Sequence, residues 1–167
     1  MLFGAGTIAE KVSELAARID RDHGDDGVVV IVVMKGAAIF AADLVRAMDT
    51  ETELAFLTAS SYSDGFTPGD TLSLRGDLDV DLRGRDVLIV DDIIDTGRTL
   101  QELSAVVAAE HPRRVATVAL VSKTSRRSPE AEPDYHGLEI AEEFIYGYGL
   151  DWDERYRDLP FIALAEP

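Results

Sequence analysis

Three short runs rich in aliphatic residues limit the folds open to this chain. They are VVVIVV at 28–33, VLIV at 87–90 and RVATVALV at 114–121. Apolar runs of this length are typical of strands buried on both faces of a parallel sheet. Segments with apolar residues at helical spacing separate them, at 38–48 and 98–110. Strands that alternate with helices predict an α/β fold with a mostly parallel, twisted sheet flanked by helices.

The remaining elements follow from weaker patterns. A first helix is predicted at 7–20, with Thr7 as its N-cap and Glu10 completing a capping box. A further strand is predicted at 53–60, and a final one at 161–165. Two extended stretches, 71–75 and 77–81, are predicted to pair as a hairpin arm.

The chain is expected to be one domain over residues 1–167, because it contains no linker or repeat and is long enough for a substantial core. The net charge of −16 argues against nucleic acid or an anionic membrane as the main partner. No apolar run has the length to span a bilayer, and no signal-peptide pattern opens the sequence. A cytoplasmic location is therefore expected.

The segment VLIVDDIIDTGRTL at 87–100 carries the most chemistry. A polar loop with three aspartates is predicted between the strand and the helix that starts at Arg98. Backbone N–H groups at that helix start, with the hydroxyls of Thr96 and Thr99, suit a phosphate group. Gly97 would let the backbone approach the ligand. The alternative interpretation is a solvated turn with a capping aspartate.

The acidic pair in this loop adds a second expectation. Asp91 and Asp92 can accept hydrogen bonds from sugar hydroxyls and hold Mg²⁺ directly or through water. An acidic pair beside a phosphate site requires a metal ion between the two kinds of anion. The segment therefore predicts a site for a phosphorylated sugar with Mg²⁺.

The same 14 residues resemble the phosphoribosyl-diphosphate signature of type I phosphoribosyltransferases. Four other features of the family occur along the chain in the expected order. They are Met34-Lys35-Gly36, Ser61-Tyr62, Ser122-Lys123 and the segment EFIYGYGLDWDERYRDLPFI at 143–162. Together they resemble the hypoxanthine-guanine phosphoribosyltransferases, most closely the compact bacterial form. The resemblance implies that the 5-phosphoribosyl group moves from phosphoribosyl diphosphate to hypoxanthine or guanine, giving IMP or GMP and pyrophosphate.

For the donor, the resemblance implies a contact with every part of the molecule. Lys35 and Gly36 would form the pyrophosphate loop, in which the bond before the lysine is often cis, and Arg157 would also reach the pyrophosphate. Asp91 and Asp92 would contact the ribose hydroxyls and Mg²⁺. The 5′-phosphate would be held by five consecutive residues: Asp95, Thr96, Gly97, Arg98 and Thr99.

For the purine, the resemblance implies contacts from two further segments. Lys123 would donate to the exocyclic O6, Phe144 would stack on the ring, and Ile145 would offer backbone groups to its edge. Asp151 would join the purine site and ligate a second Mg²⁺, and Asp95 would act near N7 as general base or acid. Alternatively, Lys123 is an ordinary strand-edge residue, Phe144 belongs to the core and Asp151 caps a turn.

The resemblance also implies a closing lid, which Ser61 and Tyr62 would begin, and assembly as a homodimer or homotetramer. Asp91 stands where the family usually has glutamate, and its shorter side chain bears on the ribose contact. Glu143 stands where the family usually has lysine, so the choice among hypoxanthine, guanine and xanthine stays open. A regulator of a different class, built on the same fold, would need a basic face for nucleic acid. The charge of −16 has the opposite sign.

Overall fold

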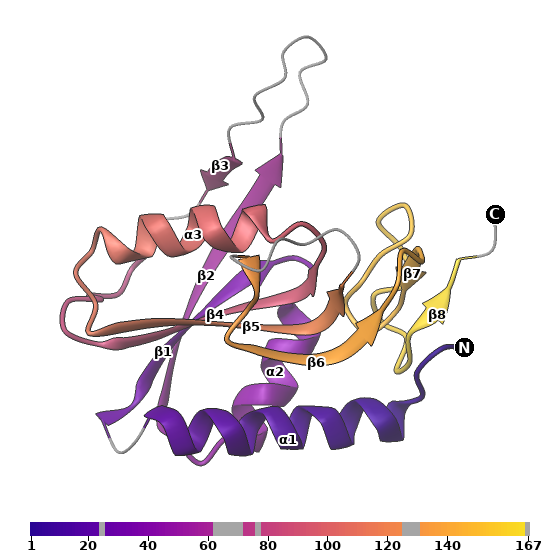
Figure 1. Cartoon of the computed structure of the whole chain (residues 1–167), viewed down its shortest axis with the longest axis horizontal. Coiled ribbons are helices and arrows are strands. Elements are labelled where there is room, and N and C mark those ends of the chain that lie inside the picture. The colour runs from indigo at the N-terminus through magenta and orange to yellow at the C-terminus, as the bar shows by residue number, and fades with distance from the viewer. Residues whose placement is uncertain (24–25, 62–71, 76–77, 125–130, 166–167) are drawn as a thin grey trace, which may run out of the picture.

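A six-stranded sheet forms the centre of the computed structural model, which describes residues 1–23, 26–61, 72–75, 78–124 and 131–165 (Figure 1). The strand order is β3-β2-β1-β4-β5-β6; β3 is antiparallel to β2 and every other pair is parallel. The strands are β1 (Val28–Met34), β2 (Thr52–Ser61), β3 (Leu72–Arg75), β4 (Asp86–Ile94), β5 (Arg114–Lys123) and β6 (Tyr135–Ile140). The predicted α/β fold with a mostly parallel sheet is confirmed.

Helices cover both faces of this sheet. α1 (Ala5–His23) and α2 (Ala38–Ala47) lie below it, and α3 (Arg98–Ala108) lies above it (Figure 1). Val28, Val30 and Val32 of β1 pack in the same core cluster as α1 and α2, whereas the alternating residues 29, 31 and 33 pack with α3. The predicted run at 28–33 is therefore a strand buried on both faces.

A second, two-stranded sheet sits at the end of the molecule where both termini lie (Figure 1). It consists of β7 (Ile145–Tyr146) and β8 (Ala163–Leu164) and, with residues 147–162 between them, is called the hood here. An antiparallel bridge joins Phe3 to Ile162, so the start of the chain holds the hood in place. Ile145 and Ile162 belong to the core cluster below the main sheet, so the hood packs on the same core.

Two predictions, the start of the first helix and the hairpin arm, are wrong because the hydrogen bonds of the backbone differ from those expected. The α1 helix begins at Ala5, and the N–H of Ile8 already donates to the carbonyl of Gly4 at 3.1 Å. Thr7 therefore lies inside the helix and is not its N-cap. No strand covers residues 78–81, and β3 pairs with β2 instead of with a following arm; residues 76–77 lie outside the described part.

The predicted polar loop after residue 90 is shorter than expected. β4 continues to Ile94 because Ile93 and Ile94 pair with Val121 and Ser122 of β5. The two adjacent aspartates therefore stand on a strand, and only residues 95–97 separate the strand from α3. At the other end of the chain, the final strand is also shorter than the predicted 161–165, since β8 covers only two residues.

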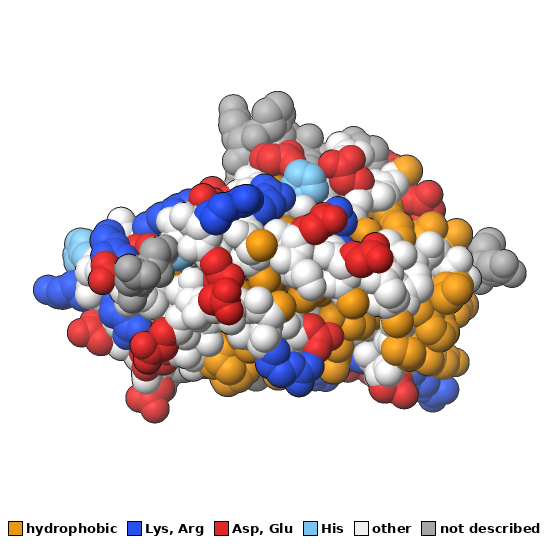
Figure 2. Space-filling model, turned by 90° about the horizontal axis from the view of Figure 1, so that it is seen from below, with side chains coloured by type: hydrophobic (Ala, Val, Ile, Leu, Met, Phe, Trp, Pro, Cys, Tyr) orange, Lys and Arg blue, Asp and Glu red, His pale blue; other side chains and the backbone are white. Residues whose placement is uncertain are grey.

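Among the described residues, no helix is both long enough and apolar enough to cross a membrane. Figure 2 views the molecule from below, where acidic and basic side chains are interspersed and hydrophobic side chains gather toward the hood end. The negative net charge is therefore not concentrated on this face.

Candidate active site

Three neighbouring parallel strands, β1, β4 and β5, end at the same edge of the sheet. Ligands of open parallel sheets bind outside the carboxyl ends of the strands. The segments that follow these ends begin with Lys35, Asp95 and Thr124. The topology thus brings the predicted donor residues and Lys123 to a single edge.

The acidic pair lies at the end of β4, where Asp91 is buried and Asp92 is partly buried. The carboxylate of Asp91 accepts the N–H of Asp92 at 3.0 Å, and that of Asp92 accepts the N–H of Ile93 at 2.9 Å. Burial raises the pKa of the Asp91 carboxyl well above its usual range, and the neighbouring charge of Asp92 raises it further. Burial also raises the pKa of Asp92. The pair is a set of hard oxygen ligands in a desolvated place, which suits a divalent cation.

The loop after β1 touches this pair. The peptide bond between Met34 and Lys35 is cis, as the resemblance implied. A Cβ added to Gly36 would lie 1.9 Å from Oδ2 of Asp92. Only glycine lets the loop backbone lie this close to the carboxylate, so the predicted pyrophosphate loop and the predicted metal residues form one surface.

Asp95 and Lys123 meet because of the strand register. Ile94 and Ser122 are paired across β4 and β5, and the two residues of interest follow them. Nζ of Lys123 lies 3.6 Å from Oδ2 of Asp95. The other carboxylate oxygen, Oδ1, is buried and has no hydrogen-bond partner among the described residues. The predicted proton-transfer group and the predicted O6 donor are therefore adjacent, with one acceptor atom left over.

The predicted phosphate cradle lies at the start of α3. Gly97 is the N-cap with φ 81°, and no side chain caps the helix. The first N–H groups of a helix have no partners within it. Nε of Arg98 donates to Glu102 at 2.6 Å, so this guanidinium follows the helix surface. Oγ1 of Thr96 lies within 3.4 Å of the N–H of Arg98, and Thr99 is half-buried in the first turn.

Close packing around Gly97 explains why this position requires glycine, and the sequence alone did not reveal that packing. A Cβ at this position would lie 2.5 Å from the Cβ of Ala131 and 2.8 Å from its carbonyl oxygen. Ala131 therefore packs on the loop of residues 95–97. The expectation that this glycine admits a ligand stays a prediction.

The hood and Phe144, which directly precedes it, carry the remaining predicted purine residues. The side chain of Phe144 is 59 % exposed, which excludes the alternative that it belongs to the core. The N–H of Ala165 donates to the carbonyl of Phe144 at 2.8 Å, so the Ile145–Leu164 pair is of the non-hydrogen-bonded kind. The backbone N–H and C=O of Ile145 therefore point away from β8.

The turn at the end of the hood gathers four charged side chains. Arg157 donates to the carbonyl of Gly149 at 2.7 Å and pairs with Oδ1 of Asp151 at 2.7 Å. Oδ2 of Asp151 accepts the N–H of Glu154 at 2.9 Å, which is the bond that a turn-capping aspartate makes. Lys35 donates to Glu154 at 2.8 Å. Sequence reasoning missed Glu154, because its partner stands 119 residues earlier in the chain.

The hood also touches the loop after β1 directly. A Cβ on Gly149, whose φ is 97°, would lie 2.2 Å from the carbonyl oxygen of Gly36. Two glycine backbones thus meet where the hood closes on the loop after β1.

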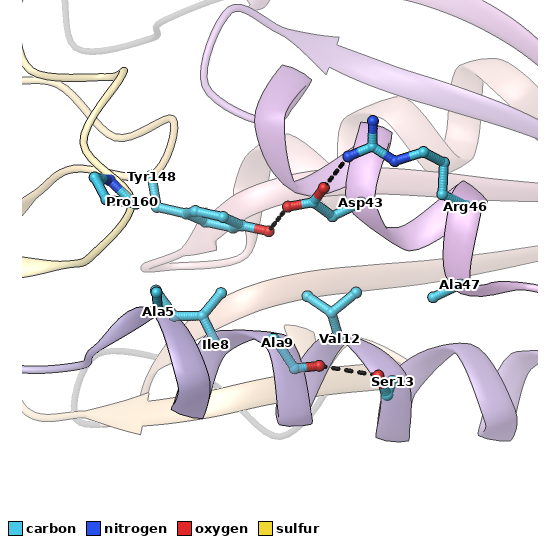
Figure 3. A pocket seen from close by; sticks show the side chains of 10 residues that line it. All are labelled: Ala5, Ile8, Ala9, Val12, Ser13, Asp43, Arg46, Ala47, Tyr148 and Pro160. Atoms are coloured by element: carbon cyan, nitrogen blue, oxygen red, sulfur yellow. Dashed lines mark hydrogen bonds and ion pairs between the residues drawn. The ribbon is translucent and has the colours of Figure 1, made fainter.

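A hollow of about 420 Å³ lies between α1, α2 and the hood (Figure 3). In it the hydroxyl of Tyr148 donates to Asp43, which also pairs with Arg46. Burial raises the pKa of Tyr148 above its ordinary value. None of the predicted site residues lines the hollow. We interpret it as part of the packing interface between the hood and α2.

Two predicted parts of the site are not assembled in the described structure: a single metal centre and the lid. Among the described residues, no three His, Cys, Asp or Glu side chains gather closely enough to hold a metal ion, so Asp91, Asp92 and Asp151 do not form one metal centre. Ser61 is the last residue of β2, and Tyr62 with most of the predicted lid lies outside the described residues.

Comparison with known proteins gives consistent matches. Residues 3–153 match the family model of the phosphoribosyl transferase domain. The chain is similar to the hypoxanthine-guanine phosphoribosyltransferase of Aquifex aeolicus, with 39 % identity over 95 % of this chain and 90 % of that protein. It is similar to the hypoxanthine phosphoribosyltransferase of Escherichia coli K12, with 38 % identity over 93 % and 89 %. A crystal structure of a hypoxanthine-guanine phosphoribosyltransferase from Bacillus anthracis superimposes with a TM-score of 0.94, at 39 % identity and with 99 % and 98 % of the chains covered.

Proposed function

The chain belongs to the phosphoribosyltransferase family, and we propose that it is a purine salvage enzyme acting on hypoxanthine, guanine or both. It transfers the 5-phosphoribosyl group of phosphoribosyl diphosphate to the purine and releases pyrophosphate with IMP or GMP. Its fold is the type I phosphoribosyltransferase fold that the sequence resemblance implied. The observation that carries the substrate assignment is the 3.6 Å approach of Lys123 to Asp95 at the ends of two neighbouring strands.

The donor occupies the sheet edge in this proposal. The N–H groups at the start of α3, with the hydroxyls of Thr96 and Thr99, hold the 5′-phosphate. Asp91 and Asp92 accept hydrogen bonds from the ribose hydroxyls. The loop of Lys35 and Gly36 holds the pyrophosphate together with Arg157, whose buried Nε has no hydrogen-bond partner among the described residues.

Mg²⁺ fits the acidic groups of the site. Mg²⁺ is typically bound by one or two carboxylates, and substrate phosphates and water complete its shell. Asp91 and Asp92 supply two such carboxylates, and Asp151 would serve a second ion at the hood. When bound, Mg²⁺ would neutralise charge that develops on the leaving pyrophosphate.

The purine enters between the hood and the ends of β4 and β5. Lys123 donates to the exocyclic O6, which selects 6-oxopurines, while exposed Phe144 stacks on the ring and the outward backbone of Ile145 meets its edge. As N9 of the purine bonds to the anomeric carbon, Asp95 accepts the proton from N7. The partnerless Oδ1 of Asp95 is the acceptor atom available for that proton.

The residues around the reacting atoms have the charges that the transition state requires. Loss of pyrophosphate gives the ribose oxocarbenium character, which nearby carboxylates stabilise, and places extra charge on the leaving group, which cations stabilise. The oxocarbenium would react with water, so a lid is useful. We assign that lid to the segment that begins with Ser61 and Tyr62.

We further propose that residues 1–167 are a single domain, since the hood and the main sheet share one core cluster. A homodimer or homotetramer is supported by two large exposed apolar side chains, Leu54 and Phe56, on the face of β2 opposite the residues that pack with α3. A cytoplasmic location agrees with substrates of high negative charge, which do not cross a bilayer unaided.

The test is a panel assay with purified protein, phosphoribosyl diphosphate, Mg²⁺ and one of five bases. Hypoxanthine and guanine are expected to give nucleotide and pyrophosphate, whereas adenine and uracil are expected to give neither. Xanthine separates a strict hypoxanthine-guanine enzyme from one that also accepts xanthine. Absence of turnover with both hypoxanthine and guanine would contradict the proposal.

A further inference from the structure

The carboxylate of Glu154 lies between the two cations assigned above to pyrophosphate. Its Oε2 accepts a hydrogen bond from Nζ of Lys35 at 2.8 Å, and its Oε1 faces a terminal nitrogen of Arg157 at 3.6 Å. Each oxygen therefore has a different cation. The side chains of Glu154 and Lys35 are both about two-thirds exposed, so this arrangement is open to solvent and to a competing anion.

The backbone around this residue is unusual. Trp152 and Arg155 exchange backbone hydrogen bonds at 3.1 and 3.2 Å, which closes a two-residue turn with Asp153 and Glu154 at its tip. The tip residues have φ of 56° and 60°. Turns of this kind favour asparagine and glycine, and a glutamate with positive φ is disfavoured. Glutamate does not favour the backbone conformation of this turn. We therefore look to its side chain for the reason that glutamate stands at this position.

The turn is also fixed in direction. The carboxylate of Asp151 accepts the N–H of Glu154 at 2.9 Å and pairs with Arg157 at 2.7 Å. Because Arg157 in turn donates to the carbonyl of Gly149, the tip is tied to the part of the hood that touches Gly36. Glu154 therefore points toward the pyrophosphate loop through a connected set of bonds.

We infer that Glu154 is a positioning residue that neutralises Lys35 and Arg157 when no donor is bound and competes with pyrophosphate for both cations. This inference rests on the proposed function, which assigns the two cations to pyrophosphate. When the donor enters, the carboxylate leaves the cations; when the reaction has released pyrophosphate, it returns to them. Glu154 thus weakens the binding of pyrophosphate and promotes the release of this product.

The size of the effect follows from exposure. Exposed ion pairs contribute little, and removal of such a competitor is expected to tighten pyrophosphate binding by about 2- to 5-fold. The gain must depend on Lys35, because the shorter of the two contacts is to that residue. It must also exceed the general effect of removing one negative charge, which screening by salt makes small at the surface.

The experiment measures the affinity for inorganic pyrophosphate with Mg²⁺ by calorimetry in the wild type and five variants. Four of the variants are Glu154→Gln, Asp153→Asn, Lys35→Met and the double variant Lys35→Met with Glu154→Gln, which is compared with Lys35→Met alone. Asp153→Asn is the matched control, since this substitution removes the same charge one position away. The ion pairs of this turn in the described structure involve Glu154 and not Asp153. Glu154→Asn is a second variant, because asparagine tolerates positive φ.

The expected result is a gain of about 2- to 5-fold in Glu154→Gln and Glu154→Asn, with little change in Asp153→Asn. On the Lys35→Met background the gain should fall to about 1.5-fold or less, since only the longer contact to Arg157 remains. Product inhibition by pyrophosphate should strengthen by the same factor as the affinity. Unchanged or weaker binding in both Glu154 variants, or an equal gain in Asp153→Asn, overturns the inference.

The experiments distinguish an error in the role of Glu154 from an error in the proposed function. If the wild type binds pyrophosphate and converts hypoxanthine or guanine, but the Glu154 variants show no gain, only the role of Glu154 is wrong. If the wild type neither binds pyrophosphate nor converts a purine, the proposed function is wrong.

Discussion

Replacing Gly149 by alanine should both destabilise the protein and impair use of the donor. The added methyl group would lie 2.2 Å from the carbonyl oxygen of Gly36, and Gly149 has φ of 97°. An ordinary contact would require the two backbones to separate by about 1 Å. The hood and the pyrophosphate loop cannot both keep their positions after this change.

The magnitude has two parts. Placing a residue with a Cβ at positive φ costs about 1–2 kcal/mol, and overpacking at a tight contact typically adds about 1–3 kcal/mol. The expected loss in the free energy of unfolding is therefore about 2–5 kcal/mol. For a domain of this length, each kcal/mol lowers Tm by about 2–4 °C, so a fall of about 4–20 °C is expected.

Gly84→Ala is the matched control. Gly84 also has positive φ, at 70°, but a Cβ there would have nothing within 4 Å. Thermal unfolding of both variants separates the backbone cost from the contact. Steady-state kinetics should show kcat/KM for phosphoribosyl diphosphate falling by up to about 10²-fold in Gly149→Ala, as misplacement by about 1 Å can cause, and little change in Gly84→Ala. Equal Tm values and unchanged kinetics in the two variants would refute the contact between hood and loop as a functional feature.

Three further predictions concern single side chains. Asp95→Asn should lower kcat by about 10²-fold or more, as loss of a general acid–base group does, while donor affinity measured by calorimetry stays unchanged; an unaltered kcat would remove Asp95 from proton transfer. Lys123→Met should raise KM for hypoxanthine by about 10- to 10²-fold, the range for a lost hydrogen bond to a charged group; an unaltered KM would exclude the contact with O6. Burial and the charge of Arg114 lower the pKa of His23 in the folded state, so the unfolded chain binds the proton more readily. Stability is then complete above about pH 6.5 and is lost as the pH falls below it; His23→Gln should flatten this dependence of Tm between pH 7 and 5, and equal slopes would contradict it.

The sequence predicted the central strands well because their signal is local. The run at 28–33 has no polar residue, and such a run buries on both faces wherever it pairs. The end of β4 was harder to predict, because adjacent aspartates are typical of a loop. The pairing of Ile93 and Ile94 with β5 overrides that preference, and no local pattern reports a partner strand.

The candidate site shows the same division. Asp95 could be singled out because it stands in a recognisable segment, and its neighbour Lys123 because it ends an apolar run. The role of Glu154 could not be found, since its contact with Lys35 depends on how a hood turn meets a distant loop. Likewise, the reason for Gly97 became visible only with the position of Ala131.

The contact between Lys35 and Glu154 has a consequence for how the protein acquires activity during folding. Contacts between residues far apart in the chain form slowly, because a long loop must close before they contribute any stabilisation. Helices and neighbouring strands have shorter loops to close. During refolding, secondary structure should therefore return before Lys35 and Glu154 come into contact. Enzyme activity should be the last property that the chain regains.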